Sequence, residues 1–83
     1  MTKLDTYEIK NTNNEVVFSG LFYSFKECVE AAVSRKINLE GANLQDANLY
    51  KCNLEHANLQ GADLRYVNLE GANLYKCNLQ GVK

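Results

Sequence analysis

The sequence predicts an all-β solenoid that is covered at its N-terminal end by a small β-hairpin and an α-helix. Two observations carry this prediction. A five-residue repeat runs without a slip from residue 37 to residue 81, and the non-repeating residues 1–36 show a hairpin pattern followed by a helix pattern. The chain has 83 residues, a length that fits one small domain. Residues 1–36 are therefore expected to form a cap and residues 37–83 a solenoid, within one continuous domain.

The repeat consists of nine units, and its third residue is always Leu. The second residue is Asn in eight units and Asp in one, and the first is small or β-branched. A period of five matches neither the 3.6 residues of a helix turn nor the alternation of a long strand, but it fits a chain that turns a corner every five residues. The first and third residues then point the same way, as on a short strand, and fill a narrow core if four units close one coil. Gly stands at the fifth position of four units, where a tight turn favours it.

This A-(D/N)-L-x-x pattern in residues 37–81 resembles the pentapeptide-repeat family. The resemblance implies a right-handed quadrilateral β-helix of about two and a quarter coils, with Leu and the small residue inward and Asn outward. At ~4.8 Å per coil the solenoid would be only ~11 Å tall. The cap is similar to one found before pentapeptide repeats in small phage and bacterial proteins.

Residues 1–36 predict the cap from local signals. Two β-rich runs between residues 7 and 18 flank the sequence Asn-Thr-Asn-Asn, which is typical of a β-hairpin. Ser24 and Glu27 match a capping box, and apolar residues follow at helical spacing. We expect a helix from about 25 to 35, ending in Arg35-Lys36, whose charges suit the C-terminal end of the helix dipole.

Composition excludes several classes of function. The formal net charge of −1 argues against direct nucleic-acid binding, which normally needs a basic excess. No apolar run approaches the ~18 residues of a membrane span, and the N-terminal residues predict no secretory signal. Three Cys without a CxxC pair predict a reduced, cytoplasmic protein.

No residue pattern predicts catalysis, a metal or a cofactor. His56, the only His, is expected as an exposed corner residue, and Cys52 and Cys77 as small core residues that lie on different faces. Asn side chains in register are expected to bond to one another along the coil and to satisfy backbone groups, rather than to form a ligand-binding array. An enzyme needs a concave site with convergent polar groups, and the sequence predicts none. We therefore expect a non-enzymatic protein.

Exposed tyrosines give the best indication of function. Tyr50 and Tyr75 stand at the fourth position of two identical LYKCNL segments. Counting four units per coil places Tyr50 beside Glu70. Tyr75 lies one face further on, and Lys76 follows it at the next corner, beside His56. Tyr with a neighbouring charge is favoured at protein interfaces. We expect the two tyrosines with Glu70 and Lys76 to form a contact patch; the alternative is that they are scattered surface residues.

Three functions stay open at this point. The first is a protein-binding module, such as a small phage or bacterial antagonist of a nucleic-acid-handling or defence enzyme. The second, implied by the resemblance, is a DNA-mimicking inhibitor or protector of gyrase. This chain is near neutral, carries Asn where such rods are often acidic, and would match only about three base pairs. The third is a structural self-assembly unit.

The C-terminal coil is a second candidate contact region. No hairpin or helix pattern follows the last Leu, so the final coil is expected to expose core side chains and unpaired backbone groups. A two-fold homodimer would cover them without further growth. In the alternative, Val82 and Lys83 fold across the end and the chain stays monomeric. The residues expected at the dimer end are Leu64, Leu69, Leu74, Leu79 and Val82.

Overall fold

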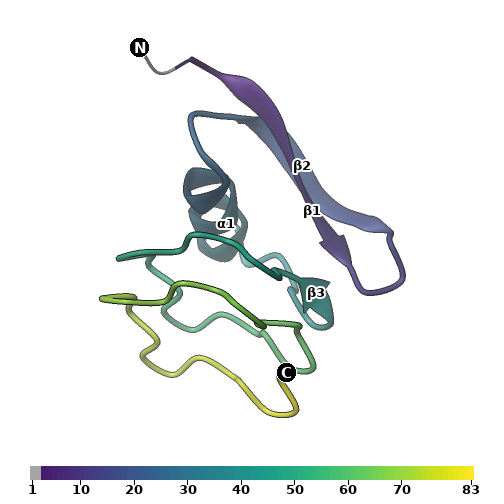
Figure 1. Cartoon of the computed structure of the whole chain (residues 1–83), viewed down its shortest axis with the longest axis vertical. Helices are drawn as coiled ribbons and strands as arrows, with labels where there is room; N and C mark the ends of the chain where they lie inside the picture. The colour runs from purple at the N-terminus through teal and green to yellow at the C-terminus, as the bar shows by residue number, and fades with distance from the viewer. Residues whose placement is uncertain (1–2) are drawn as a thin grey trace.

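A computed structural model describes residues 3–83 and places a hairpin and a helix on one end of the repeat (Figure 1). The elements are β1 (Asp5–Asn11), β2 (Val16–Phe22), α1 (Phe25–Ser34) and β3 (Ala42–Asn43). They form one three-stranded antiparallel sheet in the order β2-β1-β3, with α1 beside it. The predicted hairpin and helix are both present.

The hairpin turns where its asparagines predict. Asn11 Oδ1 accepts hydrogen bonds from the backbone N–H groups of Asn13 and Glu15, at 2.9 and 3.0 Å. Asn14 has a φ of 66°, in the left-handed region that Asn tolerates. Glu15, expected in the second strand, lies in this turn, and both strands extend further from the turn than the β-rich runs predicted.

Helix α1 begins as predicted and ends differently. Ser24 Oγ accepts a hydrogen bond from the Glu27 N–H at 3.1 Å, which is one half of the expected capping box. The helix ends at Ser34, and Arg35 is its C-cap, with its guanidinium 5.6 Å from the centre of the Phe18 ring. Lys36 follows with a φ of 60° and closes a Schellman motif. The two basic residues therefore end the helix through a stacked side chain and a left-handed backbone, rather than through charges in its last turn.

The cap joins the repeat through backbone and side-chain contacts. β1 pairs with β3, the first strand of the repeat, and the Thr12 N–H donates to the Gly41 carbonyl at 2.9 Å. On another side, a carboxylate oxygen of Glu30 in α1 accepts from the Asn53 N–H at 2.8 Å. Four cap side chains are fully buried in the same cluster as the leucines of the repeat: Ile9, Cys28, Val29 and Ala32.

Each five-residue unit ends in the same turn. The Leu carbonyl accepts from the N–H three residues later in all nine units, at 2.9–3.3 Å. The fifth residue has a φ between 54° and 73° whether it is Gly or not, and a positive φ at this position alone defines a type II turn. The five corners without Gly are Asp46, Lys51, His56, Tyr66 and Lys76.

The second residue of each unit stabilises this turn. Its side-chain Oδ1 accepts a hydrogen bond from the backbone N–H two residues later, at 3.0–3.2 Å, in all nine units. Two asparagine pairs twenty residues apart also bond side chain to side chain, Asn58 to Asn38 and Asn68 to Asn48. The predicted role of Asn in satisfying backbone groups is thus confirmed in all eight units that contain it, and Asp63 makes the same bond in the ninth. The predicted bonding of Asn side chains between units is confirmed in two pairs.

Residues twenty apart lie side by side in the repeat. Four isolated parallel bridges join Asn43 to Asp63, Asn48 to Asn68, Asn53 to Asn73 and Asn58 to Asn78. Beyond β3, residues 44–83 form single-residue bridges and no strand of two or more residues. We call residues 37–56 the first winding and residues 64–83 the terminal winding. The complete right-handed quadrilateral β-helix stays a prediction.

The core is closed at the capped end and open at the other. The first and third residues point inward as predicted, and the leucines from Leu39 to Leu59 are at most 1% exposed. In the terminal winding the equivalent side chains are only partly buried, although they pack against the same core. Burial therefore depends on what covers each end and not on the repeat itself.

Candidate protein-binding surface

The turn geometry presents the fourth and fifth side chains of each unit to solvent. These residues are the two central positions of the type II turn, so the backbone positions their side chains and the core does not use them. The exposed aromatic residues of the repeat occupy these positions: Tyr50 is 44% exposed, Tyr75 58% and Tyr66 80%.

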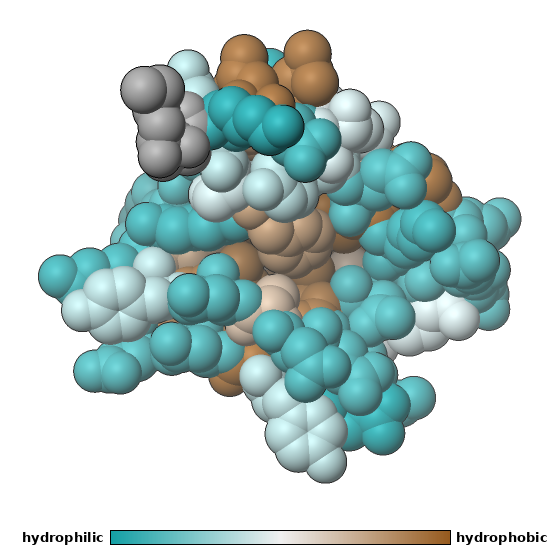
Figure 2. Space-filling model, turned by 45° about the horizontal axis from the view of Figure 1, so that its top comes forward, coloured by the Kyte–Doolittle hydropathy of each residue, from teal (hydrophilic) through white to brown (hydrophobic). Residues whose placement is uncertain are grey.

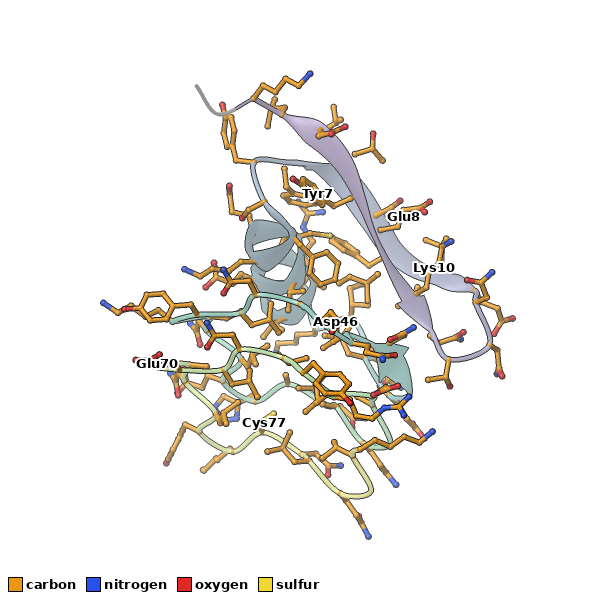
Figure 3. All side chains as sticks on the ribbon, viewed as in Figure 1. Tyr7, Glu8, Lys10, Asp46, Glu70 and Cys77 are labelled. Carbon is orange, nitrogen blue, oxygen red and sulfur yellow. The ribbon has the colours of Figure 1, made fainter. Side chains whose placement is uncertain are left out.

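The first tyrosine group lies at the corner after Leu49. Lys51 Nζ is 5.3 Å from the centre of the Tyr50 ring, a cation–π arrangement. The Lys51 N–H donates to the Glu70 carbonyl at 2.8 Å, which places Glu70 on the adjacent winding. Glu70 projects from the edge of the repeat in Figure 3. The structure thus brings Tyr50 and Glu70 into neighbouring turns, as the sequence predicted.

The second group forms at the next corner. Lys76 Nζ is 5.4 Å from the centre of the Tyr75 ring, and the His56 ring meets the same ring edge-on with centroids 6.0 Å apart. The His56 N–H donates to the Tyr75 carbonyl at 2.9 Å. His56 is therefore a neighbour of the predicted patch residues Tyr75 and Lys76, and its contact with the Tyr75 ring was not predicted.

A groove beside α1 differs from the sequence-based expectation of no concave site. It has a volume of about 1100 Å³ and runs between α1 and the first winding. Its polar lining includes Glu30, Lys36, Glu55 and His56, and its apolar lining includes Ile37. No sequence signal could have revealed this groove, because the position of α1 over the repeat creates it.

The cysteines of the repeat are core residues. Burial, with a smaller contribution from the carboxylate of Glu30, raises the pKa of the Cys52 thiol to about 12, so it is uncharged at neutral pH. Burial also raises the pKa values of Cys28 and Cys77. All three are free, and Figure 3 shows Cys77 within the last winding. Thiolate is the nucleophile and the metal ligand, so these groups are poorly suited to either role.

Asp63, the one departure from Asn at the second position, carries the repeat's ion pair. Its carboxylate accepts from Arg65 Nε at 3.0 Å and from Arg65 Nη2 at 2.8 Å, and the residue is only 4% exposed. The hydrogen bonds from the Arg65 side chain outweigh burial and lower the pKa of Asp63 from 3.8 to about 2.

Replacing Asp63 is expected to change how stability depends on acid. Because the folded-state pKa is depressed, the stabilisation is present above pH 3.8 and is lost as the pH falls through about 2. Asp63→Asn should keep the turn bond, be less stable than the natural chain at pH 7, and lose this difference near pH 2. Thermal unfolding followed by circular dichroism across this range checks the expectation, with Arg65→Gln as a control that should match Asp63→Asn at pH 7. An unchanged stability gap at low pH would contradict it.

The C-terminal residues continue the winding. The Lys83 N–H donates to the Ala62 carbonyl and the Leu64 N–H to the Lys83 carbonyl, both at 3.0 Å. Lys83 therefore pairs alongside residues 62–64 in the pattern of the other windings, and does not cross the end of the core. The residues predicted at the dimer end all remain half-buried: Leu64, Leu69, Leu74, Leu79 and Val82.

Other kinds of site find no support in the described part of the chain. Among residues 3–83 no group of three or more His, Cys, Asp or Glu side chains is arranged to hold a metal ion. Helix α1, with ten residues, is too short to cross a membrane, and no other helix occurs in residues 3–83.

Taken together, nine identical corners on a leucine core define a repeat protein whose variable side chains lie outside. A family model described as pentapeptide repeats (8 copies) matches residues 35–61 and 42–81, which is more than half of the chain. The chain belongs to the pentapeptide-repeat family, as the sequence predicted. No curated protein matches it.

Proposed function

We propose that this chain is a non-enzymatic protein-binding module, and that it acts as a small phage or bacterial antagonist of a nucleic-acid-handling or defence enzyme. The observation that carries the proposal is the pair of exposed tyrosines, Tyr50 and Tyr75, each with a lysine ammonium over its ring at a turn that the backbone holds. A tyrosine ring that packs against a lysine side chain presents an apolar face and a polar hydroxyl group, which suits a protein interface. Membership of a family of binding and structural proteins supports the class.

The scaffold in this proposal is a right-handed quadrilateral β-helix of about two and a quarter coils. The twenty-residue offset of all four parallel bridges and the repeated turn at every fifth residue support it. Such a coil presents flat sides separated by corners, so Tyr50 with Glu70 and Tyr75 with Lys76 would lie on adjoining sides. These four residues form the proposed contact patch.

Truncation of the patch tyrosines is the direct test of binding. The tagged chain is used to capture a partner from bacterial lysate, and the partner's affinity is then measured for Tyr50→Ala combined with Tyr75→Ala. Loss of an interface Tyr typically costs about 1–4 kcal/mol of binding free energy with little change in folding. Tyr66→Ala is the matched control, because Tyr66 is a more exposed corner tyrosine outside the patch. Unchanged binding by the double variant would overturn this patch.

Self-assembly through the terminal winding is the second candidate, since its leucines are only half-buried. A two-fold contact there would cover Leu64, Leu69, Leu74 and Leu79 and double the length of the rod. Light scattering at micromolar concentration should give at least twice 9.4 kDa for the natural chain, and Leu79→Lys should lower this mass by half or more. A mass of 9.4 kDa for the natural chain would refute the dimer.

DNA mimicry of the gyrase-inhibitor kind is the remaining alternative. Residues 37–81 carry five acidic and three basic side chains, an excess of only two negative charges. A duplex presents one charge per ~1.7 Å, so a single ~11 Å rod falls short of it and a dimer approaches it more closely. Inhibition of gyrase supercoiling by the dimer, and its absence with the Leu79→Lys variant, would favour this alternative over the patch.

A further inference from the structure

Strand β2 has one long edge without a backbone partner. In the sheet order β2-β1-β3, β2 is an outer strand, and its register with β1 uses only one of its two edges. Among residues 3–83 no backbone hydrogen bond joins β2 to any element other than β1. Figure 1 shows β2 on the outside of the hairpin, at the end of the molecule away from the terminal winding.

The free edge of β2 carries little of the usual protection against pairing. Soluble proteins block outer strands with charged residues, Pro or bulges. β2 reads VVFSGLF, with no charged residue and no Pro, and its bulge lies at the turn end, opposite Ile9 and Lys10. Seven residues span ~24 Å, which is long enough for a stable strand pair.

Apolar side chains are exposed along the outer face of the same strand. Figure 3 shows Glu8 and Lys10 on the side of β1 that faces away from α1. The register pairs Ser19 with Glu8, and Leu21 with Thr6, so both β2 residues share this outer face. Leu21 is 64% exposed and Val16 is 49% exposed. In Figure 2 hydrophobic atoms reach the surface at the hairpin end of the molecule.

We propose that β2 pairs with β2 of a second copy of this chain, antiparallel, about a two-fold axis at Ser19. The strand is complementary to itself in this arrangement, because it is apolar at both ends and small at its centre. Val17 of one copy then lies beside Leu21 of the other, twice, and regular pairing stops at the bulge opposite Ile9 and Lys10. We call this β2–β2 contact the seam. Because β2 carries no charge, the seam places no like charges opposite each other, and the two Ser19 hydroxyls can form a hydrogen bond across the axis.

Gly20 also fits this register. With Ser19 on the axis, Phe18 of one copy lies opposite Gly20 of the other, so no two large side chains meet at this pair. Within one chain the Phe22 ring already lies over Gly20, since a Cβ there would be 2.8 Å from it. The result is a continuous six-stranded sheet in which the free β2 edge of each copy is paired with that of the other.

This contact is independent of the terminal winding and of the tyrosine patch. It lies at the opposite end of the molecule from the terminal winding, as Figure 1 shows. Two different two-fold contacts at opposite ends would link chains into an open row, so each must be tested with the other removed. The Leu79→Lys substitution removes the proposed C-terminal contact. Dimerisation measured in this background therefore reports β2 pairing alone, whether or not the C-terminal dimer exists.

A site-specific disulfide tests the register. In a Cys77→Ala background, Ser19→Cys places two thiols directly opposite on the axis, ~5 Å apart between Cα atoms, within the range of a disulfide. Thr6→Cys is the control, since Thr6 lies on the same face one strand further in and its two copies would be ~14 Å or more apart. With oxidised glutathione, Ser19→Cys should form a covalent dimer at least ten times faster than Thr6→Cys. Equal rates would overturn the proposal.

A charge placed on the seam tests the energetics. In the Leu79→Lys background, Ser19→Lys sets two ammonium groups against each other and should raise the dimer dissociation constant at least tenfold in sedimentation equilibrium. Thr6→Lys makes a similar charge change off the seam and should leave it unchanged. Ser19 and Thr6 are both exposed, so both variants are expected to fold, which circular dichroism verifies. A monomeric Leu79→Lys background, or equal dissociation constants for the two lysine variants, would overturn the β2 pairing.

Discussion

Leu49→Ala is expected to lower the free energy of unfolding by about 2–5 kcal/mol, and Leu69→Ala by about half as much or less. The two leucines occupy the same position of units twenty residues apart, and the Leu49 N–H bonds to the carbonyl of Asn68 next to Leu69. Leu49 is fully buried, in the cluster that also contains Ile9 and Val29, whereas Leu69 is only partly buried. Truncating Leu49 leaves an enclosed cavity, while truncating Leu69 leaves a gap that water can partly fill, since Leu69 is only partly buried.

Urea unfolding followed by circular dichroism measures both losses, at a concentration where the chain is monomeric. The slope of the unfolding free energy with urea should stay constant, which shows that the folded and unfolded states are otherwise unchanged. Equal losses for the two variants would mean that the terminal winding is as enclosed as the first, which the partial burial of Leu69 contradicts. Repeating the Leu69→Ala measurement at higher concentration also reports whether a second copy covers this end.

Removal of residues 1–36 is expected to abolish the folded state of the repeat. The cap contributes four fully buried side chains, the β1–β3 pairing and the Glu30 carboxylate that accepts from Asn53. Without it the inward leucines of the first winding would meet water, and a repeat end without a cap is prone to aggregate. The 37–83 fragment should show no β-type circular dichroism as a soluble monomer.

Two full-length variants test whether loss of the contact between cap and repeat causes the unfolding. Val29→Asp places a charge in the fully buried contact between α1 and the first winding and should be as damaging as the deletion. Glu8→Ala changes an exposed residue of the same cap and should leave stability nearly unchanged. A soluble, monomeric, β-structured 37–83 fragment would show instead that the cap and the repeat are separate domains.

Local chemistry explains why much of the fold was predictable. Each corner closes within five residues: the Leu carbonyl accepts from the next unit and the Asn side chain accepts from the N–H two residues on. Gly at the fifth position predicted four of these corners from the sequence. Corners such as Lys51 and Tyr66 adopt the same left-handed backbone, because the hydrogen bonds of the turn and of the neighbouring winding outweigh the cost of a side chain there.

The candidate site was predictable only in part. Counting units correctly placed Tyr50 beside Glu70 and Lys76 beside His56, since the offset of twenty residues is a property of the repeat. The cation–π contacts and the edge-on ring of His56 depend on side-chain rotamers that a five-residue pattern does not specify. The groove along α1 required the helix to be positioned first.

By itself the sequence determined the units, the turns and the inward leucines, because all of these follow from contacts within a few residues or at a fixed offset. Only the tertiary structure decided what lies on each end of the core. It paired β1 with β3, left the outer edge of β2 free, and set Glu30 against Asn53. It also made Leu49 fully buried and Leu69 only partly buried at identical repeat positions. The physical reason is that burial depends on neighbours contributed by distant residues, which a periodic sequence cannot distinguish.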